Sequence, residues 1–116
     1  MNHDIEIPSS DKFIDFPGMR GLRFARLGEA EGKTLEVIEG EKDVVIPAMT
    51  HPSAEKGRVL SGSLRFMKNG SIQILKKGDV WSVAADEMQG PHIILENGTM
   101  VAIFREGKSA LDGAHH

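Results

Sequence analysis

The stretch HPSAEKGRVLSG (residues 51–62) is the most informative part of this sequence. A second glycine-containing stretch, GDVW (residues 78–81), follows it. His51 and Glu55 flank a short turn-like segment, and Gly62 closes the strand-like run after it. Side chains alternate between the two faces of a strand, so Glu55, Gly57 and Val59 share a face. A histidine ending one strand and a glutamate beginning the next can converge on one point inside a barrel.

Strand-like segments dominate the chain after residue 20. They are rich in β-branched and aromatic residues and are bounded by glycine, glutamate and lysine. The predicted strands are residues 21–27, 34–38, 43–47, 58–67, 71–75, 92–95 and 100–105. Asn-Gly pairs at 69–70 and 97–98 each predict a tight hairpin, because a type I′ turn needs positive φ at both central residues. The pattern predicts an all-β sandwich or barrel, and we expect six to ten antiparallel strands.

The two ends of the chain differ from this central part. Residues 1–20 combine apolar pairs with proline and glycine, and they predict either an arm along a neighbouring sheet edge or an edge strand of the same barrel. We expect residues 21–108 to form one β-barrel domain. Residues 109–116, which end in His115 and His116, are interpreted as a flexible tail or the remnant of a tag.

The composition is that of an ordinary globular domain. Hydrophobic residues make up 40% of the 116 residues and charged residues 27%, and the net charge is −3. This small charge, spread along the chain, predicts neither a nucleic-acid nor a membrane partner. No apolar run is long enough to span a bilayer, and no signal peptide is recognisable, so we expect a cytoplasmic location. The absence of cysteine excludes disulfides and thiolate chemistry.

The first stretch resembles the first motif of the cupin family, G-x5-H-x-H-x(3,4)-E-x6-G. His51 matches the second histidine of that motif, Glu55 the glutamate and Gly62 the closing glycine. Met49 stands where the first histidine is expected, and Asp43 replaces the first glycine. The resemblance implies a small single-domain cupin (cupin-2 type, RmlC-like), which is a double-stranded β-helix or jelly-roll barrel.

The second cupin motif, G-x5-P-x-G-x2-H-x3-N, is matched more sparsely. Gly78 fits, and Ala84, Asp86, Gln89 and Ile93 replace the proline, second glycine, histidine and asparagine. The metal-binding motif is therefore degenerate, and the resemblance covers about residues 35–105.

The resemblance implies a functional site in the barrel, and two hypotheses about its chemistry stay open. In the first, His51 and Glu55 bind a divalent transition metal (Fe, Mn, Ni, Zn or Cu), and Gln89 or His92 completes the site. His92 would then need a bend at Gly90-Pro91 to turn toward the site. The protein would be a metal-dependent dioxygenase, isomerase or lyase acting on a small organic substrate.

In the second hypothesis the cavity binds a small organic ligand without a metal. His51 and Glu55 would form a hydrogen-bonded pair, which can also act as general acid and base. Met49 and Gln89 would then contact the ligand.

Three further expectations concern the surface and the core. Small cupins that resemble this one pack or exchange N-terminal strands, so residues 5–16 predict a homodimer. Trp81 and Phe66 are predicted in the core. Four arginines are predicted on the solvated outer face, namely Arg23, Arg26, Arg58 and Arg65.

Overall fold

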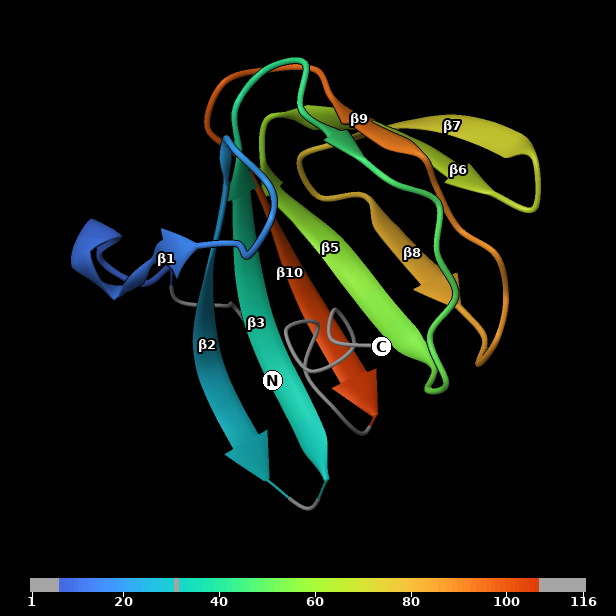
Figure 1. Cartoon of the computed structure of the whole chain (residues 1–116), viewed down its shortest axis with the longest axis horizontal. Coiled ribbons are helices and arrows are strands. Elements are labelled where there is room, and N and C mark those ends of the chain that lie inside the picture. The colour runs from blue at the N-terminus through green and yellow to red at the C-terminus, as the bar shows by residue number, and fades with distance from the viewer. Residues whose placement is uncertain (1–6, 31, 107–116) are drawn as a thin grey trace.

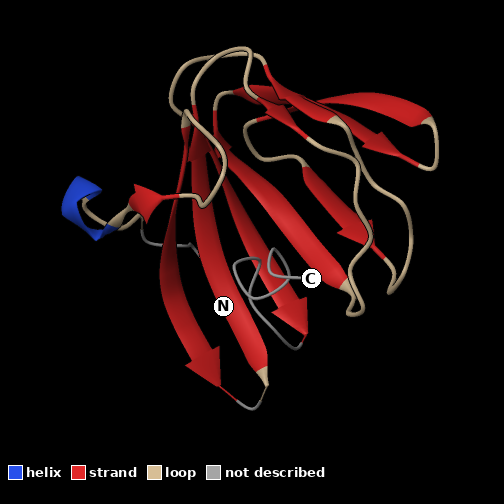
Figure 2. Cartoon of the chain, in the orientation of Figure 1, coloured by secondary structure: helices blue, strands red, loops and turns tan. Residues whose placement is uncertain are grey.

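The computed structural model describes residues 7–30 and 32–106, and it consists almost entirely of strands and loops (Figure 2). One 3-10 turn, η1, covers Ser10–Lys12. Ten strands follow in chain order: β1 (Ile14–Asp15), β2 (Leu22–Ala30), β3 (Lys33–Gly40), β4 (Val45–Ile46), β5 (Glu55–Ser61), β6 (Ser63–Lys68), β7 (Ser71–Lys76), β8 (Val80–Val83), β9 (His92–Ile94) and β10 (Thr99–Glu106). No helix in the described part of the chain could cross a membrane.

The strands form two antiparallel sheets that face each other (Figure 1). The larger sheet has the order β1-β2-β3-β10-β5-β8, and the smaller one has the order β4-β9-β6-β7. The main core lies between them, and residues from both sheets meet in it, such as Phe24, Val59 and Ile103 with Leu64 and Ile94. The all-β prediction is therefore confirmed.

A single glycine moves the chain from one sheet to the other. The sequence predicted one strand over residues 58–67, but β5 ends at Ser61 in the larger sheet and β6 begins at Ser63 in the smaller one. Gly62 between them has φ of 77°, which favours glycine, and a Cβ there would lie 2.2 Å from Thr99 Oγ1. The expectation of one continuous strand is wrong because the chain turns a corner at Gly62.

The two Asn-Gly pairs behave differently. Asn69 and Gly70 both have positive φ, and β6 pairs with β7 across them, so this hairpin is confirmed. Gly98 also has positive φ, but β9 belongs to the smaller sheet and β10 to the larger one. The second predicted hairpin is wrong, since this turn connects two sheets instead of two paired strands.

The N-terminal residues that the structure describes lie on the edge of the larger sheet. Ile14 and Asp15 of β1 pair with Phe24 and Arg23 of β2 in the same chain. Phe13 is buried in a second, smaller cluster on the outer face of this sheet, with Ala25, Val37 and Ala102. Residues 1–6 and the predicted tail at 109–116 lie outside the described residues.

Candidate functional site

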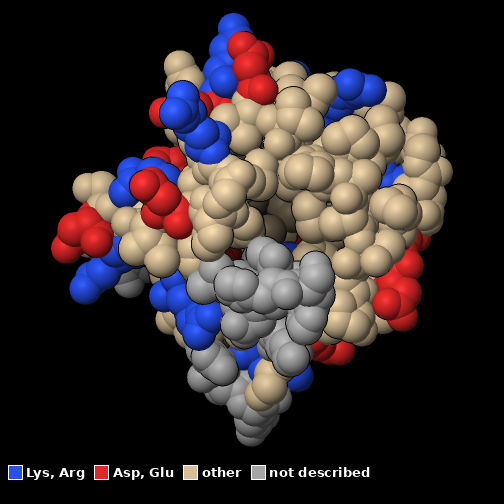
Figure 3. All heavy atoms as spheres, in the orientation of Figure 1, with Lys and Arg blue, Asp and Glu red and all other residues tan. Residues whose placement is uncertain are grey.

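The candidate site is a cavity of about 650 Å³ between the two sheets. Its wall is mostly apolar, with side chains such as Leu22, Ile38, Phe66 and Ile103. Polar side chains gather in one part of the wall: His51, Glu55, Gln89, His92 and Arg105. A hollow is visible near the middle of the face that Figure 3 shows, and most of the side chains around it are uncharged.

The predicted site residues all reach this cavity. Met49, His51, Glu55, Gln89 and His92 belong to its lining. Met49 and Gln89 exchange backbone hydrogen bonds of 2.8 and 2.9 Å, which fixes the loop after β4 against the segment before β9. The predicted residues therefore share one cavity, and their functional roles remain predictions.

Glu55 is the centre of the polar group. It is 3% exposed and accepts three side-chain hydrogen bonds. Arg105 donates to its Oε1 at 2.7 Å, and Trp81 Nε1 and Gln89 Nε2 donate to its Oε2 at 3.2 and 3.3 Å. A carboxylate needs such partners when it is buried.

His92 is joined to Glu55 through Gln89. Its Nδ1 accepts a hydrogen bond from the Met67 backbone N–H at 3.2 Å, so Nε2 carries the proton and donates to Gln89 Oε1 at 3.0 Å. Its ring stacks on Phe66 at 4.4 Å. Burial lowers the pKa of His92 to about 4, and the nearby Glu55 carboxylate only partly opposes this. His92 is therefore neutral at pH 7.

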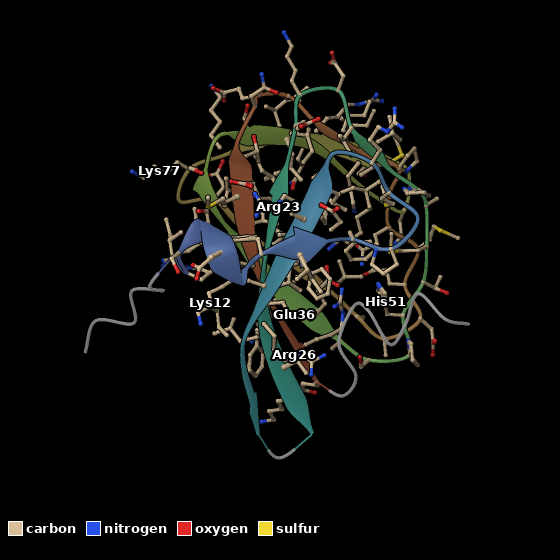
Figure 4. The ribbon with its side chains drawn as sticks, turned by 60° about the vertical axis from the view of Figure 1, so that its left-hand side comes forward. Lys12, Arg23, Arg26, Glu36, His51 and Lys77 are labelled. Carbon is tan, nitrogen blue, oxygen red and sulfur yellow. The ribbon has the colours of Figure 1, made fainter. Side chains whose placement is uncertain are left out.

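Arg105 is a site residue that sequence reasoning missed. It is 4% exposed, and its guanidinium lies between Glu55 and the Glu36 carboxylate, whose Oε1 is 3.6 Å from Arg105 Nη1. Arg26 lies 3.9 Å from the other oxygen of Glu36, which extends the alternation of charges toward the surface. Figure 4 shows Arg26 and Glu36 close together on β2 and β3.

A strand-parity signal was available for Arg105. Val101 and Ile103 face the core from β10, and Arg105 follows them with the period of two that places it on the same face. Trp81 was predicted in the core, and it is there, but it also donates to Glu55. Glu36 has the same kind of parity signal, since it is paired with Ile103.

His51 is half-buried at the edge of the polar group. Its Nε2 lies 3.5 Å from Arg105 Nη2, and no described hydrogen bond joins it to Glu55, so Arg105 stands between the two residues that were expected to pair. Burial lowers the pKa of His51, and the positive charge of Arg105 adds to this effect, while Glu55 opposes it. His51 is the member of the group with the weakest contacts.

The observed arrangement does not fit a divalent metal. In the described residues no three histidine, aspartate or glutamate side chains are grouped as metal ligands. The guanidinium of Arg105 already brings a positive charge against Glu55 and His51. Both ring nitrogens of His92 and both amide atoms of Gln89 are engaged in hydrogen bonds.

Comparison with protein-family models gave no match for this sequence, and neither did comparison with curated proteins. Solved structures do match. KdgF from Halomonas sp. has a TM-score of 0.79 at 16% identity, over 87% of this chain and 94% of that one. An RmlC-like cupin from Shewanella frigidimarina has a TM-score of 0.75 at 18% identity, over 91% and 95%. AerE from Microcystis aeruginosa has a TM-score of 0.72 at 17% identity, over 84% and 46%.

These likenesses cover 84–91% of this chain, and they agree with the two-sheet topology. The described part of the chain therefore has the fold of an RmlC-like cupin, a jelly roll of two antiparallel sheets.

Proposed function

We propose that this protein binds a small organic molecule in the cavity between its sheets and does so without a resident metal. The contact between His51 and Arg105 supports this proposal most directly. A volume of about 650 Å³ with few polar groups in a mostly apolar wall is typical of small-molecule sites. The apolar wall would hold the body of the ligand, and the polar end would fix its orientation.

The hydrogen bonds of the site indicate which residues meet the ligand. Hydrogen bonds within the protein already engage the polar atoms of Glu55, Gln89 and His92, which bond to one another and to Trp81 and Met67. His51 is half-buried and has one long described contact, at 3.5 Å. A ligand oxygen or N–H group can replace that contact at little cost, because a hydrogen bond at this distance is weak. His51 and Arg105 are thus the proposed recognition pair.

Proton transfer is available to this pair. His51 is neutral at pH 7, because burial and Arg105 lower its pKa. Its Nε2, which faces the Arg105 donor, can accept a proton from a ligand that replaces this contact. Arg105 can stabilise negative charge that develops on a ligand oxygen next to it. Glu55 holds Arg105 in place and takes no direct part in this transfer.

Trp81 provides the test. It is the only tryptophan of the chain, which also has no tyrosine, and it lines the cavity, so its fluorescence reports on this site. We would titrate chelator-treated protein lacking residues 115–116 with small ketones, alcohols, amides and carboxylic acids. We expect a saturable fluorescence change with at least one of these classes and its loss in His51→Phe.

Metal analysis of the same preparation separates this proposal from the metal-dependent dioxygenase, isomerase or lyase. Saturable binding with the chelator present supports metal-free recognition. Stoichiometric metal that disappears in His51→Ala, together with binding that requires added metal, would overturn it.

A further inference from the structure

The charges that line the inner cavity cancel. Among the described lining residues, Glu55 and Arg105 are the only ones other than histidine with an ionisable acidic or basic side chain, and they are paired at 2.7 Å. On its other side Arg105 lies 3.6 Å from the buried carboxylate of Glu36. The cavity therefore offers no excess charge to an ionised ligand, which would lose its hydration without gaining a free counter-charge.

Arg105 cannot offer a carboxylate ligand the usual two-pronged contact. Arginine binds a carboxylate most strongly through two parallel N–H groups, which come from Nη2 together with Nε or Nη1. Nε and Nη1 of Arg105 are both buried. Nη2 is therefore the atom left to meet a ligand, and this geometry disfavours an ionised carboxylic acid.

The two hydrogens of Arg105 Nη2 have different acceptors. One is donated to Glu55 Oε1 at 2.7 Å, and the other faces His51 Nε2 at 3.5 Å. Because a guanidinium group only donates, His51 Nε2 is the acceptor of this long contact. A ligand atom that takes the place of the contact must therefore accept from Nη2 and donate to Nε2.

A hydroxyl group does both with a single uncharged oxygen. An oxygen about 2.9 Å from each nitrogen fits beside two atoms that are 3.5 Å apart. An ether or ketone oxygen only accepts, so it would leave His51 Nε2 without a donor. An amide accepts and donates through two different atoms, and an ammonium group only donates and brings a second cation to Arg105.

The rest of the lining suits a ligand with one polar group. Glu55, Gln89 and His92 are already hydrogen-bonded within the protein. Thr50 is the remaining polar side chain of the described lining apart from Trp81, His51 and Arg105, and it is exposed. Additional hydroxyl groups deep in the cavity would therefore lie against apolar side chains and lack partners.

We infer that the ligand is an uncharged alcohol with one hydroxyl group on an apolar body, and that this hydroxyl bridges Arg105 Nη2 and His51 Nε2. The inference rests on the proposed function and adds the chemical class of the ligand to it. The apolar body lies against the wall between the two sheets.

Probes that share a cyclohexyl ring test this class. They are cyclohexylmethanol, its isomer cyclohexyl methyl ether, cyclohexanecarboxylate and cyclohexylmethylammonium, and none of them absorbs where tryptophan does. Each is titrated at neutral pH into chelator-treated protein lacking residues 115–116, and the fluorescence of Trp81 in the cavity wall reports binding. We expect cyclohexylmethanol to bind at least about fivefold more tightly than each of the others, because it alone satisfies both nitrogens without adding a charge.

Variants of the lining locate the hydroxyl. His51→Phe removes the acceptor and should abolish the preference for the alcohol over the ether, whereas His51→Gln keeps a side-chain acceptor and should retain most of it. Thr50→Val is the matched control, since it removes the other lining hydroxyl at nearly constant size and should leave the preference unchanged. Thermal unfolding shows that each variant is folded.

The outcomes separate the ligand class from the proposed function. Saturable binding in which the ether, the carboxylate or the ammonium equals the alcohol would overturn the hydroxyl assignment and leave small-molecule binding in place. The same conclusion follows if the preference survives in His51→Phe or disappears in Thr50→Val, or if only ketones, amides or acids of the wider titration bind. Absence of binding throughout that titration would contradict the proposed function itself.

Discussion

Arg105 combines burial with opposing charges on both sides. Its guanidinium is 2.7 Å from Glu55 and 3.6 Å from Glu36, and both carboxylates are nearly inaccessible to solvent. Burying any one of these charges alone would cost several kcal/mol, so each is tolerated because of the others. The motif positions led to His51 and Glu55, and strand parity places Arg105 on the core face of β10. The contact of Arg105 with both residues could not be predicted, because charge partners from distant strands are set by the sheet order.

Replacing Arg105 tests this dependence. We expect Arg105→Met to lower the free energy of unfolding by about 3–5 kcal/mol, because Glu55 loses its buried cation. The matched control is Arg23→Met on the same sheet, whose pair with Glu39 is partly exposed, and it should cost no more than about 1 kcal/mol. Urea unfolding followed by fluorescence measures both. Equal losses in the two variants would contradict the buried-pair interpretation.

His92 predicts a pH dependence of stability. Its pKa is lowered from 6.5 to about 4 in the folded state, so the unfolded chain takes up a proton first as the pH falls. The free energy of unfolding therefore keeps its full value, as far as His92 is concerned, above pH 6.5. It decreases as the pH falls toward 4, and the loss due to His92 is at most about 3 kcal/mol.

Comparison with the His92→Gln variant isolates the effect of His92 on the pH dependence of the free energy of unfolding. Carboxylates also titrate in this range, but they are the same in both proteins. The unfolding free energy of the variant should fall less steeply between pH 6.5 and pH 4 than that of the unchanged chain. Parallel pH profiles would show that the neutral state of His92 makes no contribution.

The packing of β5 against Trp81 requires a residue without a side chain at position 57. Gly57 lies opposite Trp81 on β8, and a Cβ there would be 2.0 Å from Trp81 Cζ2. Gly57 therefore leaves the space that the indole occupies, and from there Trp81 donates to Glu55. The sequence analysis placed Gly57 on the same face as Glu55 and Val59, but only the pairing of β5 with β8 explains why a glycine is needed there.

We predict that Gly57→Ala destabilises the protein by about 1–3 kcal/mol or more, since the indole must move in a packed core. Gly28→Ala on β2 is the matched control, because a Cβ there meets no atom within 4 Å, and we expect a change of less than about 1 kcal/mol. Unfolding curves give the stabilities, and the emission maximum of Trp81 reports its displacement. An unshifted emission maximum in Gly57→Ala would argue against the predicted contact.

Local signals predicted the elements well where neighbours in sequence are also partners in a sheet. The hairpin at Asn69-Gly70 follows from turn chemistry alone. The turn at Gly98 has similar chemistry but leads β10 between β3 and β5, in the other sheet from β9. Turn residues encode the bend of the backbone, whereas the strand that is met after the bend depends on the packing of the whole core.

At the scale of the molecule, the cavity exists because two sheets meet through strands that are distant in sequence. Glu55 comes from β5, Trp81 from β8, His92 from β9 and Arg105 from β10, and His51 from the loop before β5. Motif spacing predicted the fold, and it led to His51 and Glu55, which line this cavity. The hydrogen-bond partners of Glu55 could not be predicted from motif spacing. They depend on which side chains of distant strands the sheet order places within reach of Glu55.

Arg105 places a permanent positive charge inside the barrel, next to Glu55. The positive charge at its centre is part of the polypeptide, so it is present from synthesis onward and does not vary with the supply of iron or zinc. Histidines introduced at positions 49 and 89 would line the same cavity as Arg105, whose guanidinium already contacts Glu55 and His51. A metal ion bound among them would meet this positive charge, so we expect metal binding to require the loss of Arg105 as well.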